Sequence, residues 1–163
     1  MIRLKQNPLR IFLADDDVDD RELFGEAIKE TIPDTSILTF SNGNALIEHL
    51  KNTRSVDPDI IFLDINMPLK NGKECLFEIR KDNRFQSTPI IMFSTSLDMR
   101  DIADTYHGGA NLFISKPDSF RTQVEVFKQV FNLYSNNLLV AHTVTDFVFA
   151  NAAHHNSAGR LGM

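Results

Sequence analysis

The amino-acid sequence predicts an α/β protein with a doubly wound, five-stranded parallel sheet that helices cover on both faces. Three observations predict it. Short apolar runs alternate five times with segments of helical periodicity, which is the pattern of an α/β fold. The third run, residues 59–63, is apolar on both faces, as a central parallel strand is. Each intervening helix supplies the right-handed crossover that joins parallel strands.

The individual elements follow from local signals along the chain. Residues 10–14 are an apolar run too short for a helix, so they predict a strand. Residues 19–31 repeat apolar side chains at helical spacing, and Pro33 ends that helix. The same criteria predict the remaining elements, in chain order a strand at 36–40, a helix at 44–51, a strand at 59–63, a helix at 73–81, a strand at 89–93, a helix at 99–107, a strand at 111–115 and a helix at 119–134.

The length of 163 residues suits one domain with a hydrophobic core, which we expect to span residues 8–137. Residues 138–163 do not fit the repeat and are interpreted as a partly frayed C-terminal tail. Its apolar stretches at 138–140 and 147–150 could add an edge strand to the sheet or pack on the last helix. The tail contains three histidines, His142, His154 and His155. Because they lack matching carboxylates or thiolates nearby, a solvated tail is favoured over a metal site.

Composition and charge argue against several classes of protein. The net charge of −5 argues against direct nucleic-acid binding, which needs a basic surface. The single cysteine, Cys75, allows no intramolecular disulfide, and its apolar neighbours favour a buried side chain over a reactive thiol. The sequence shows no signal peptide, and no apolar stretch approaches the roughly 20 residues of a membrane-spanning helix. We therefore expect a cytoplasmic protein without membrane insertion.

Acidic residues follow two of the strands expected near the centre of the sheet. Asp15, Asp16 and Asp17 follow the first strand, and Asp64 follows the third. Because ligands of doubly wound sheets bind at the carboxyl ends of the strands, these carboxylates should share one crevice. Desolvated carboxylates repel one another, and a Mg²⁺ ion would relieve that repulsion. An acidic N-cap for the first helix explains the run at 15–17 equally well when that run is taken alone.

A hydroxyl and a lysine follow the last two strands. Ser94 follows the fourth strand and could donate to a phosphoryl oxygen, although a helix N-cap gives the same pattern. Lys116 follows the fifth strand, where its ammonium could neutralise a phosphoryl group, and its bond to Pro117 could be cis. With a metal bound, Asp64 would be an ionised oxygen nucleophile toward phosphorus. Together these residues predict phosphoryl transfer, which depends on positioning and charge neutralisation.

Four motifs carry a resemblance to a known family. They are Ile-Phe-Leu-Ala-Asp-Asp-Asp at 11–17, Ile-Ile-Phe-Leu-Asp-Ile-Asn-Met-Pro at 60–68 with Gly72, Pro-Ile-Ile-Met-Phe-Ser-Thr at 89–95, and Gly-Ala-Asn-Leu-Phe-Ile-Ser-Lys-Pro at 109–117. With these motifs the chain resembles the receiver domains of response regulators, including the CheY-like chemotaxis type, over residues 8–136. The resemblance implies a flavodoxin-like (βα)5 receiver fold with strand order 2-1-3-4-5.

The resemblance also implies roles for the residues at the strand ends. Asp64 would be the phosphoacceptor, and Lys116 would contact the phosphoryl group. Asp16 would bind Mg²⁺ directly and Asp15 through water. Asp64 and the main-chain carbonyl of Asn66 would complete the protein ligands, and Mn²⁺ can substitute for Mg²⁺.

Two further residues would transmit the signal. By the resemblance, Ser94 is the switch hydroxyl and Phe113 the switch aromatic. On phosphorylation Ser94 would move toward the phosphate and Phe113 would turn inward. That change would repack the surface around the fourth helix, the fifth strand and the fifth helix, which is the usual output face of the family. Asp17 falls outside the acidic pair and should face the start of the first helix.

The resemblance further implies a place in two-component or phosphorelay signalling. A sensor histidine kinase or a histidine phosphotransfer protein would donate the phosphoryl group, and the output would be contact with an unknown downstream protein. We expect a stand-alone receiver that catalyses only its own phosphorylation and dephosphorylation. A phosphorylation-independent binding module is the main alternative, although such proteins usually lack an acid or the lysine. A flavin- or nucleotide-binding protein fits less well, because no glycine-rich phosphate loop follows the first strand.

Overall fold

The computed structural model describes residues 7–139 and 144–149. The five predicted strand–helix units are all present, and their ends differ from the predicted ones by at most one residue. The elements are β1 (Leu9–Ala14), α1 (Val18–Thr31), β2 (Thr35–Phe40), α2 (Gly43–Lys51), β3 (Ile60–Leu63), α3 (Gly72–Lys81), a short 3-10 helix (Asn83–Phe85), β4 (Ile90–Ser94), α4 (Met99–His107), β5 (Leu112–Ser115), α5 (Phe120–Ser135), α6 (Val144–Phe147) and β6 (Val148–Phe149).

The strands form one sheet in the order β2-β1-β3-β4-β5-β6, and every neighbouring pair is parallel. The predicted order 2-1-3-4-5 is therefore confirmed. From β1 the chain adds β2 on one side and then β3 on the other side. Doubly wound sheets bind ligands at the carboxyl ends of the strands where the strand order reverses in this way. The carboxyl ends of β1, β3, β4 and β5 consequently lie along one edge of the sheet.

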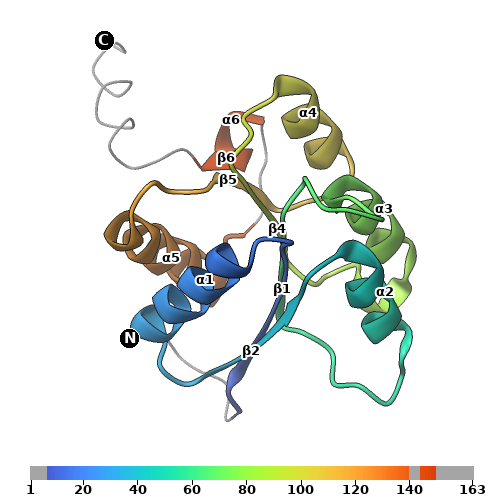
Figure 1. The fold of residues 1–163 in the computed structure, drawn as a ribbon, viewed down its shortest axis with the longest axis horizontal. Coiled ribbons are helices and arrows are strands. Elements are labelled where there is room, and N and C mark those ends of the chain that lie inside the picture. Colours follow the sequence, from blue (N-terminus) through green and yellow to red (C-terminus); the bar gives the residue numbers. More distant parts are fainter. Residues whose placement is uncertain (1–6, 140–143, 150–163) are drawn as a thin grey trace.

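Helices cover the sheet on both faces, as Figure 1 shows. Helices α1 and α5 lie together on one face, and α2, α3 and α4 lie on the other. Each face has its own hydrophobic core. Under α1 and α5 four phenylalanine rings meet mostly edge to face, Phe24, Phe62, Phe93 and Phe127. Strand β3 contributes fully buried side chains to both cores, which explains why its sequence is apolar throughout.

The C-terminal segment adds a short edge strand, which was one of the two alternatives left open by the sequence. β6 pairs with β5 in parallel, with Phe113 opposite Val148. Phe147, just before β6, is fully buried and belongs to the core under α4. At the start of β5 the side-chain amide of Asn111 donates to the carbonyl oxygen of Leu139 (2.7 Å). The chain after α5 is therefore fixed to the sheet at two places.

Three further expectations concern the cysteine, membrane insertion and the histidines of the tail. Cys75 is buried, and burial raises the pKa of its thiol to about 12, so the prediction of an unreactive side chain is supported. Across 7–139 and 144–149 no helix combines the length and apolar character needed to cross a bilayer. The histidines at 142, 154 and 155 lie outside the described residues.

Candidate functional site

The acids after β1 divide into two roles. Asp17 is the N-cap of α1, and its side chain accepts a hydrogen bond from the backbone N–H of Asp20 (3.0 Å). Asp15 is fully buried, and its carboxylate accepts from the backbone N–H of Asp17 (3.0 Å). Asp16 is exposed. The N-cap interpretation of the acidic run is therefore confirmed for Asp17, whereas Asp15 is buried and does not cap the helix, and its proposed role in holding a metal stays a prediction.

Asp64 lies directly after β3 and is only 7% exposed. Gly72 at the start of α3 packs so closely that a Cβ there would collide with the main-chain carbonyl of Asp64. The backbone N–H of Asn66 donates to the Asp64 carboxylate at a long 3.4 Å. Burial raises the pKa of Asp64; Lys116 opposes this shift and the charge of Asp15 adds to it. The ionised form of Asp64 is therefore less favourable in the folded chain than in water, because the effect of burial exceeds the attraction of Lys116.

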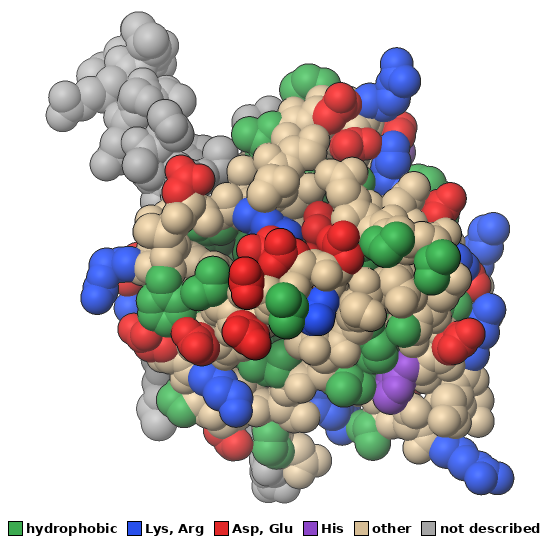
Figure 2. Space-filling view, viewed as in Figure 1, with side chains coloured by type: hydrophobic (Ala, Val, Ile, Leu, Met, Phe, Trp, Pro, Cys, Tyr) green, Lys and Arg blue, Asp and Glu red, His purple; other side chains and the backbone are tan. Residues whose placement is uncertain are grey.

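Three carboxylates converge as the sequence predicts. Asp15, Asp16 and Asp64 each present an oxygen, and these oxygens lie within 4.8 Å of one another. In Figure 2 acidic side chains gather on the viewed face near the end of β1, around a partly covered cationic side chain. Oxygen donors at this spacing, two of them from buried residues, suit a hard divalent cation such as Mg²⁺. The direction of the Asn66 carbonyl remains a prediction.

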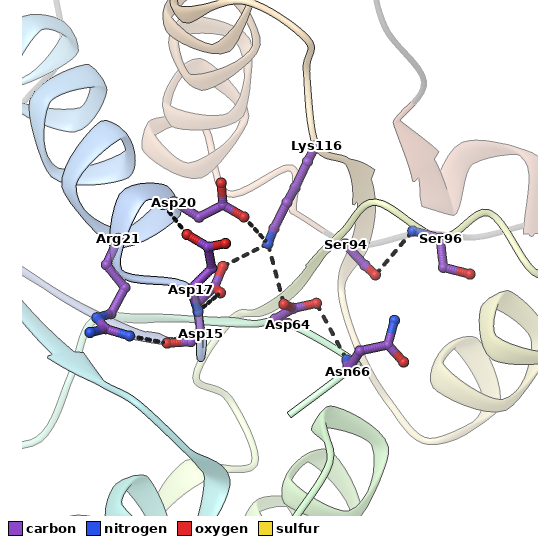
Figure 3. A network of polar contacts seen from close by, with 9 residues as sticks. All are labelled: Asp15, Asp17, Asp20, Arg21, Asp64, Asn66, Ser94, Ser96 and Lys116. Atoms are coloured by element: carbon purple, nitrogen blue, oxygen red, sulfur yellow. Dashed lines mark hydrogen bonds and ion pairs between the residues drawn. The ribbon is translucent and has the colours of Figure 1, made fainter. Parts of the chain in front are cut away.

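Lys116 joins the acidic cluster from the end of β5. Its Nζ lies 2.7 Å from Asp15 Oδ2, 2.8 Å from Asp20 Oδ2 and 3.2 Å from Asp64 Oδ2, as Figure 3 shows. Burial is the largest single influence and lowers the pKa of Lys116, but the hydrogen bonds to Asp15 and Asp20 and the charges of Asp64 and Asp15 together outweigh it and hold the pKa above its ordinary value. The ammonium is therefore fixed and charged. The bond from Lys116 to Pro117 is trans, so the cis alternative is wrong.

Asp20 also belongs to this cluster, although no sequence motif indicated it. The sequence shows only that Asp20 is an acidic residue in the first turn of α1. Acidic residues are common there, because they interact favourably with the helix dipole. Only the packing of α1 against α5 and the end of β5 brings Asp20 to the ammonium of Lys116, 96 residues away in the sequence.

Ser94 and Phe113 occupy the neighbouring strands β4 and β5. Ser94 is the last residue of β4 and is fully buried, and its hydroxyl oxygen accepts from the backbone N–H of Ser96 (3.3 Å). It is not a helix N-cap, because Asp98 caps α4. Figure 3 places Ser94 on the Asp64 side of the cluster. Phe113 is fully buried on β5, between β4 and the edge strand β6.

The fold agrees with comparisons to known proteins. The sequence profile of the response regulator receiver domain matches residues 11–128. The chain belongs to this family. It is 28% identical over 127 residues to the response regulator Rcp1 of Synechocystis sp., covering 76% of this chain and 84% of Rcp1. It is also 32% identical to a protein-glutamate methylesterase/glutaminase of Methanococcoides burtonii, a longer protein of which it spans 36%.

Solved receiver structures superpose well on this chain. The phosphorylated cyanobacterial phytochrome response regulator RcpA matches with a TM-score of 0.73 and 27% identity, covering 80% of this chain and 96% of RcpA. The Mn²⁺-bound form of Rcp1 matches with a TM-score of 0.72 over 82% of this chain and 99% of that one. At 23% identity the second likeness establishes the fold alone. These receivers share the flavodoxin-like fold of this chain.

Proposed function

We propose that this chain is a phosphoaccepting receiver of a two-component or phosphorelay system, with Asp64 as the acceptor. The observation that carries the proposal is the position of Asp64, buried at the end of β3 beside the ammonium of Lys116 and the carboxylates of Asp15 and Asp16. A sensor histidine kinase or a histidine phosphotransfer protein would be the donor. We further propose that residues 8–137 form the receiver domain and that it acts in the cytoplasm.

A divalent cation completes the proposed site. Asp15, Asp16 and Asp64 would hold Mg²⁺, or Mn²⁺ in its place, together with the main-chain carbonyl of Asn66. Two properties of the residues support the fit, namely the close spacing of three carboxylate oxygens and the burial of Asp64, which raises its pKa and which a bound cation would offset. Rcp1, the 28% identical relative, has been solved in a Mn²⁺-bound form. When bound, the cation would supply positive charge beside the phosphoryl oxygens.

The chain's own residues have defined tasks in the proposed transfer. A carboxylate oxygen of Asp64 forms a bond to phosphorus while the bond from phosphorus to the donor's imidazole nitrogen breaks, and the imidazole leaves with that electron pair. Lys116 balances the charge that arrives on Asp64, and the hydroxyl of Ser94 donates to a phosphoryl oxygen. The main contribution of the protein is to position these groups before the donor arrives.

The proposed output uses Ser94 and Phe113 as the switch. Movement of Ser94 toward the phosphoryl group would alter the packing beneath α4, and with it the face formed by α4, β5 and α5. Phosphorylation can shift that equilibrium only by its differential interaction with the two states. The expected readout is a change in affinity for a downstream protein, with no direct binding of nucleic acid.

The proposal is tested by labelling the whole chain with acetyl phosphate and Mg²⁺ and measuring its intact mass. We expect the wild type to gain one phosphoryl group and Asp64→Asn to gain none. Asp34→Asn, which removes an exposed carboxylate away from the cluster, serves as the matched control and should label normally. Equal labelling of Asp64→Asn and wild type would overturn the assignment. Absence of both labelling and Mg²⁺ binding in the wild type would favour a phosphorylation-independent binding module.

A further inference from the structure

Asp20 has no role in the proposed phosphoryl transfer, yet it contacts the ammonium of Lys116 at the centre of the site. Its carboxylate Oδ2 lies 2.8 Å from Lys116 Nζ, and its side chain is 36% exposed while that of Lys116 is 9% exposed. A lysine ammonium has three N–H donors and no acceptor. Here three carboxylates accept from it, those of Asp15, Asp20 and Asp64. Asp20 therefore completes the hydrogen bonding of Lys116.

The three contacts of the ammonium are not equivalent. Those to Asp15 and Asp20 are the shorter two, at 2.7 and 2.8 Å, and the contact to Asp64 is the longest at 3.2 Å. Asp15 directly follows β1 and Asp20 lies in the first turn of α1, so the two short contacts come from one continuous stretch of chain. That stretch anchors the ammonium, and the remaining N–H points toward the carboxylate that would receive the phosphoryl group.

The position of Asp20 is fixed independently of Lys116. Its backbone N–H donates to the side chain of Asp17, the N-cap of α1 (3.0 Å), so the first helical turn is set before any side-chain pairing. Asp20 does not belong to the group of carboxylates close enough together to share a metal ion within the described residues. It thus contacts the lysine without competing for the cation.

We propose that Asp20 is a positioning residue, which holds the ammonium of Lys116 where it can contact an oxygen of a phosphoryl group on Asp64. The inference rests on the proposed function and deepens it. Lysine is a long side chain with many rotamers, and anchoring two of its donors removes that freedom before the phosphoryl group arrives. Preorganised charge of this kind acts without reorganisation at the moment of transfer.

Charge alone predicts the opposite change in affinity for a phosphoryl group, so an experiment can distinguish the two explanations. Asp20 is negative, so its removal should by simple electrostatics favour an incoming anion. If Asp20 instead positions Lys116, removing its charge should weaken the binding of an anionic phosphoryl group. The substitution Asp20→Asn keeps the backbone N–H that Asp17 caps, so the helix start is preserved.

The test compares Asp20→Asn with Asp19→Asn in the full chain. Asp19 is exposed and lies in the same helical turn, so both variants lose one negative charge from the same region. The probe is beryllofluoride with saturating Mg²⁺, a mimic of the phosphoryl group, titrated by calorimetry. We expect Asp20→Asn to bind it about tenfold more weakly than wild type, the size of one charge-assisted hydrogen bond, and Asp19→Asn to bind like wild type.

Two further measurements separate positioning from a structural effect. Mg²⁺ titrated alone should bind Asp20→Asn and Asp19→Asn equally well, and Asp20→Glu should recover most of the beryllofluoride affinity because it restores a negatively charged acceptor for Lys116. Beryllofluoride binding by Asp20→Asn that equals or exceeds that of Asp19→Asn overturns the inference while leaving Asp64 as the acceptor. A wild-type chain that binds neither Mg²⁺ nor beryllofluoride overturns the proposed function itself.

Discussion

Phe147, from the segment after α5, packs edge to face against Phe113 of β5, with ring centroids 6.2 Å apart. Both side chains are fully buried. Tyr106 of α4 packs on Phe147 as well, at 5.4 Å between centroids. Residues beyond the family-matched part of the chain, which ends at 128, therefore complete the core next to the proposed switch aromatic. An outward turn of Phe113 would have to displace this packing.

Replacing Phe147 by alanine should destabilise the protein by about 3 kcal/mol, because it removes a fully buried aromatic side chain from between Phe113 and Tyr106. The measurement is the free energy of unfolding from urea titration. Leu138→Ala is the control, since Leu138 is apolar but 61% exposed and should cost less than about 0.5 kcal/mol. Equal stability of the two variants would mean that Phe147 is not packed in solution.

Two glycines should respond to alanine in opposite directions. Gly72→Ala places a methyl group against the Asp64 carbonyl and should destabilise the fold by about 2 kcal/mol. It should also lower the rate of acetyl phosphate labelling, because Asp64 is displaced. Gly25→Ala on α1 meets no atom within 4 Å and should stabilise the protein by roughly 0.5–1 kcal/mol through helix propensity. Thermal unfolding and labelling of both variants check this, and a neutral Gly72→Ala would contradict it.

Asp64→Asn should stabilise the metal-free protein at neutral pH. Burial raises the pKa of Asp64 above its ordinary 3.8, so the folded chain binds this proton more tightly than the unfolded chain. Wild-type stability therefore falls as the pH rises through the Asp64 pKa, a loss that asparagine does not suffer. The melting temperature in EDTA should exceed that of wild type at about pH 7, and the gap should close on acidification. A gap that widens toward acid pH would show that Lys116 outweighs burial.

Lys116→Met should destabilise the metal-free protein by about 3 kcal/mol, because it leaves the fully buried carboxylate of Asp15 without its cation. Mg²⁺ should restore stability to this variant more than to wild type, since a bound cation replaces the missing charge. Lys128→Met removes an exposed lysine and should stay within about 0.5 kcal/mol of wild type. Urea titrations with and without Mg²⁺ provide the test, and the idea fails if Mg²⁺ stabilises Lys116→Met less than wild type.

Most of the fold could be predicted from the sequence, because burial and period are local properties. A run such as 60–63 is apolar on both faces only if helices cover both, and this determines where a central strand lies. Parallel strands all end at the same edge of a sheet, so the order of elements alone places Asp64 and Lys116 at one edge together with the acids after β1. The family resemblance then supplies their expected roles.

Contacts between distant elements could not be predicted in this way. Arg80 of α3 donates to three backbone carbonyl oxygens beyond its own helix and to the side chain of Asn111, which in turn donates to Leu139. No local pattern distinguishes this half-buried guanidinium from a solvated arginine on a helix surface. Its partners are determined by how α3 is rotated against the β4–β5 region.

The sequence by itself determined the order and type of the elements and the edge of the sheet that carries the polar residues. Only the tertiary structure decided that Asp20 meets Lys116 and that Phe147 covers Phe113. The physical reason is that periodicity records which side chains leave water, whereas the partner of each side chain depends on distances between elements. Those distances are set by the packing of whole helices against the sheet.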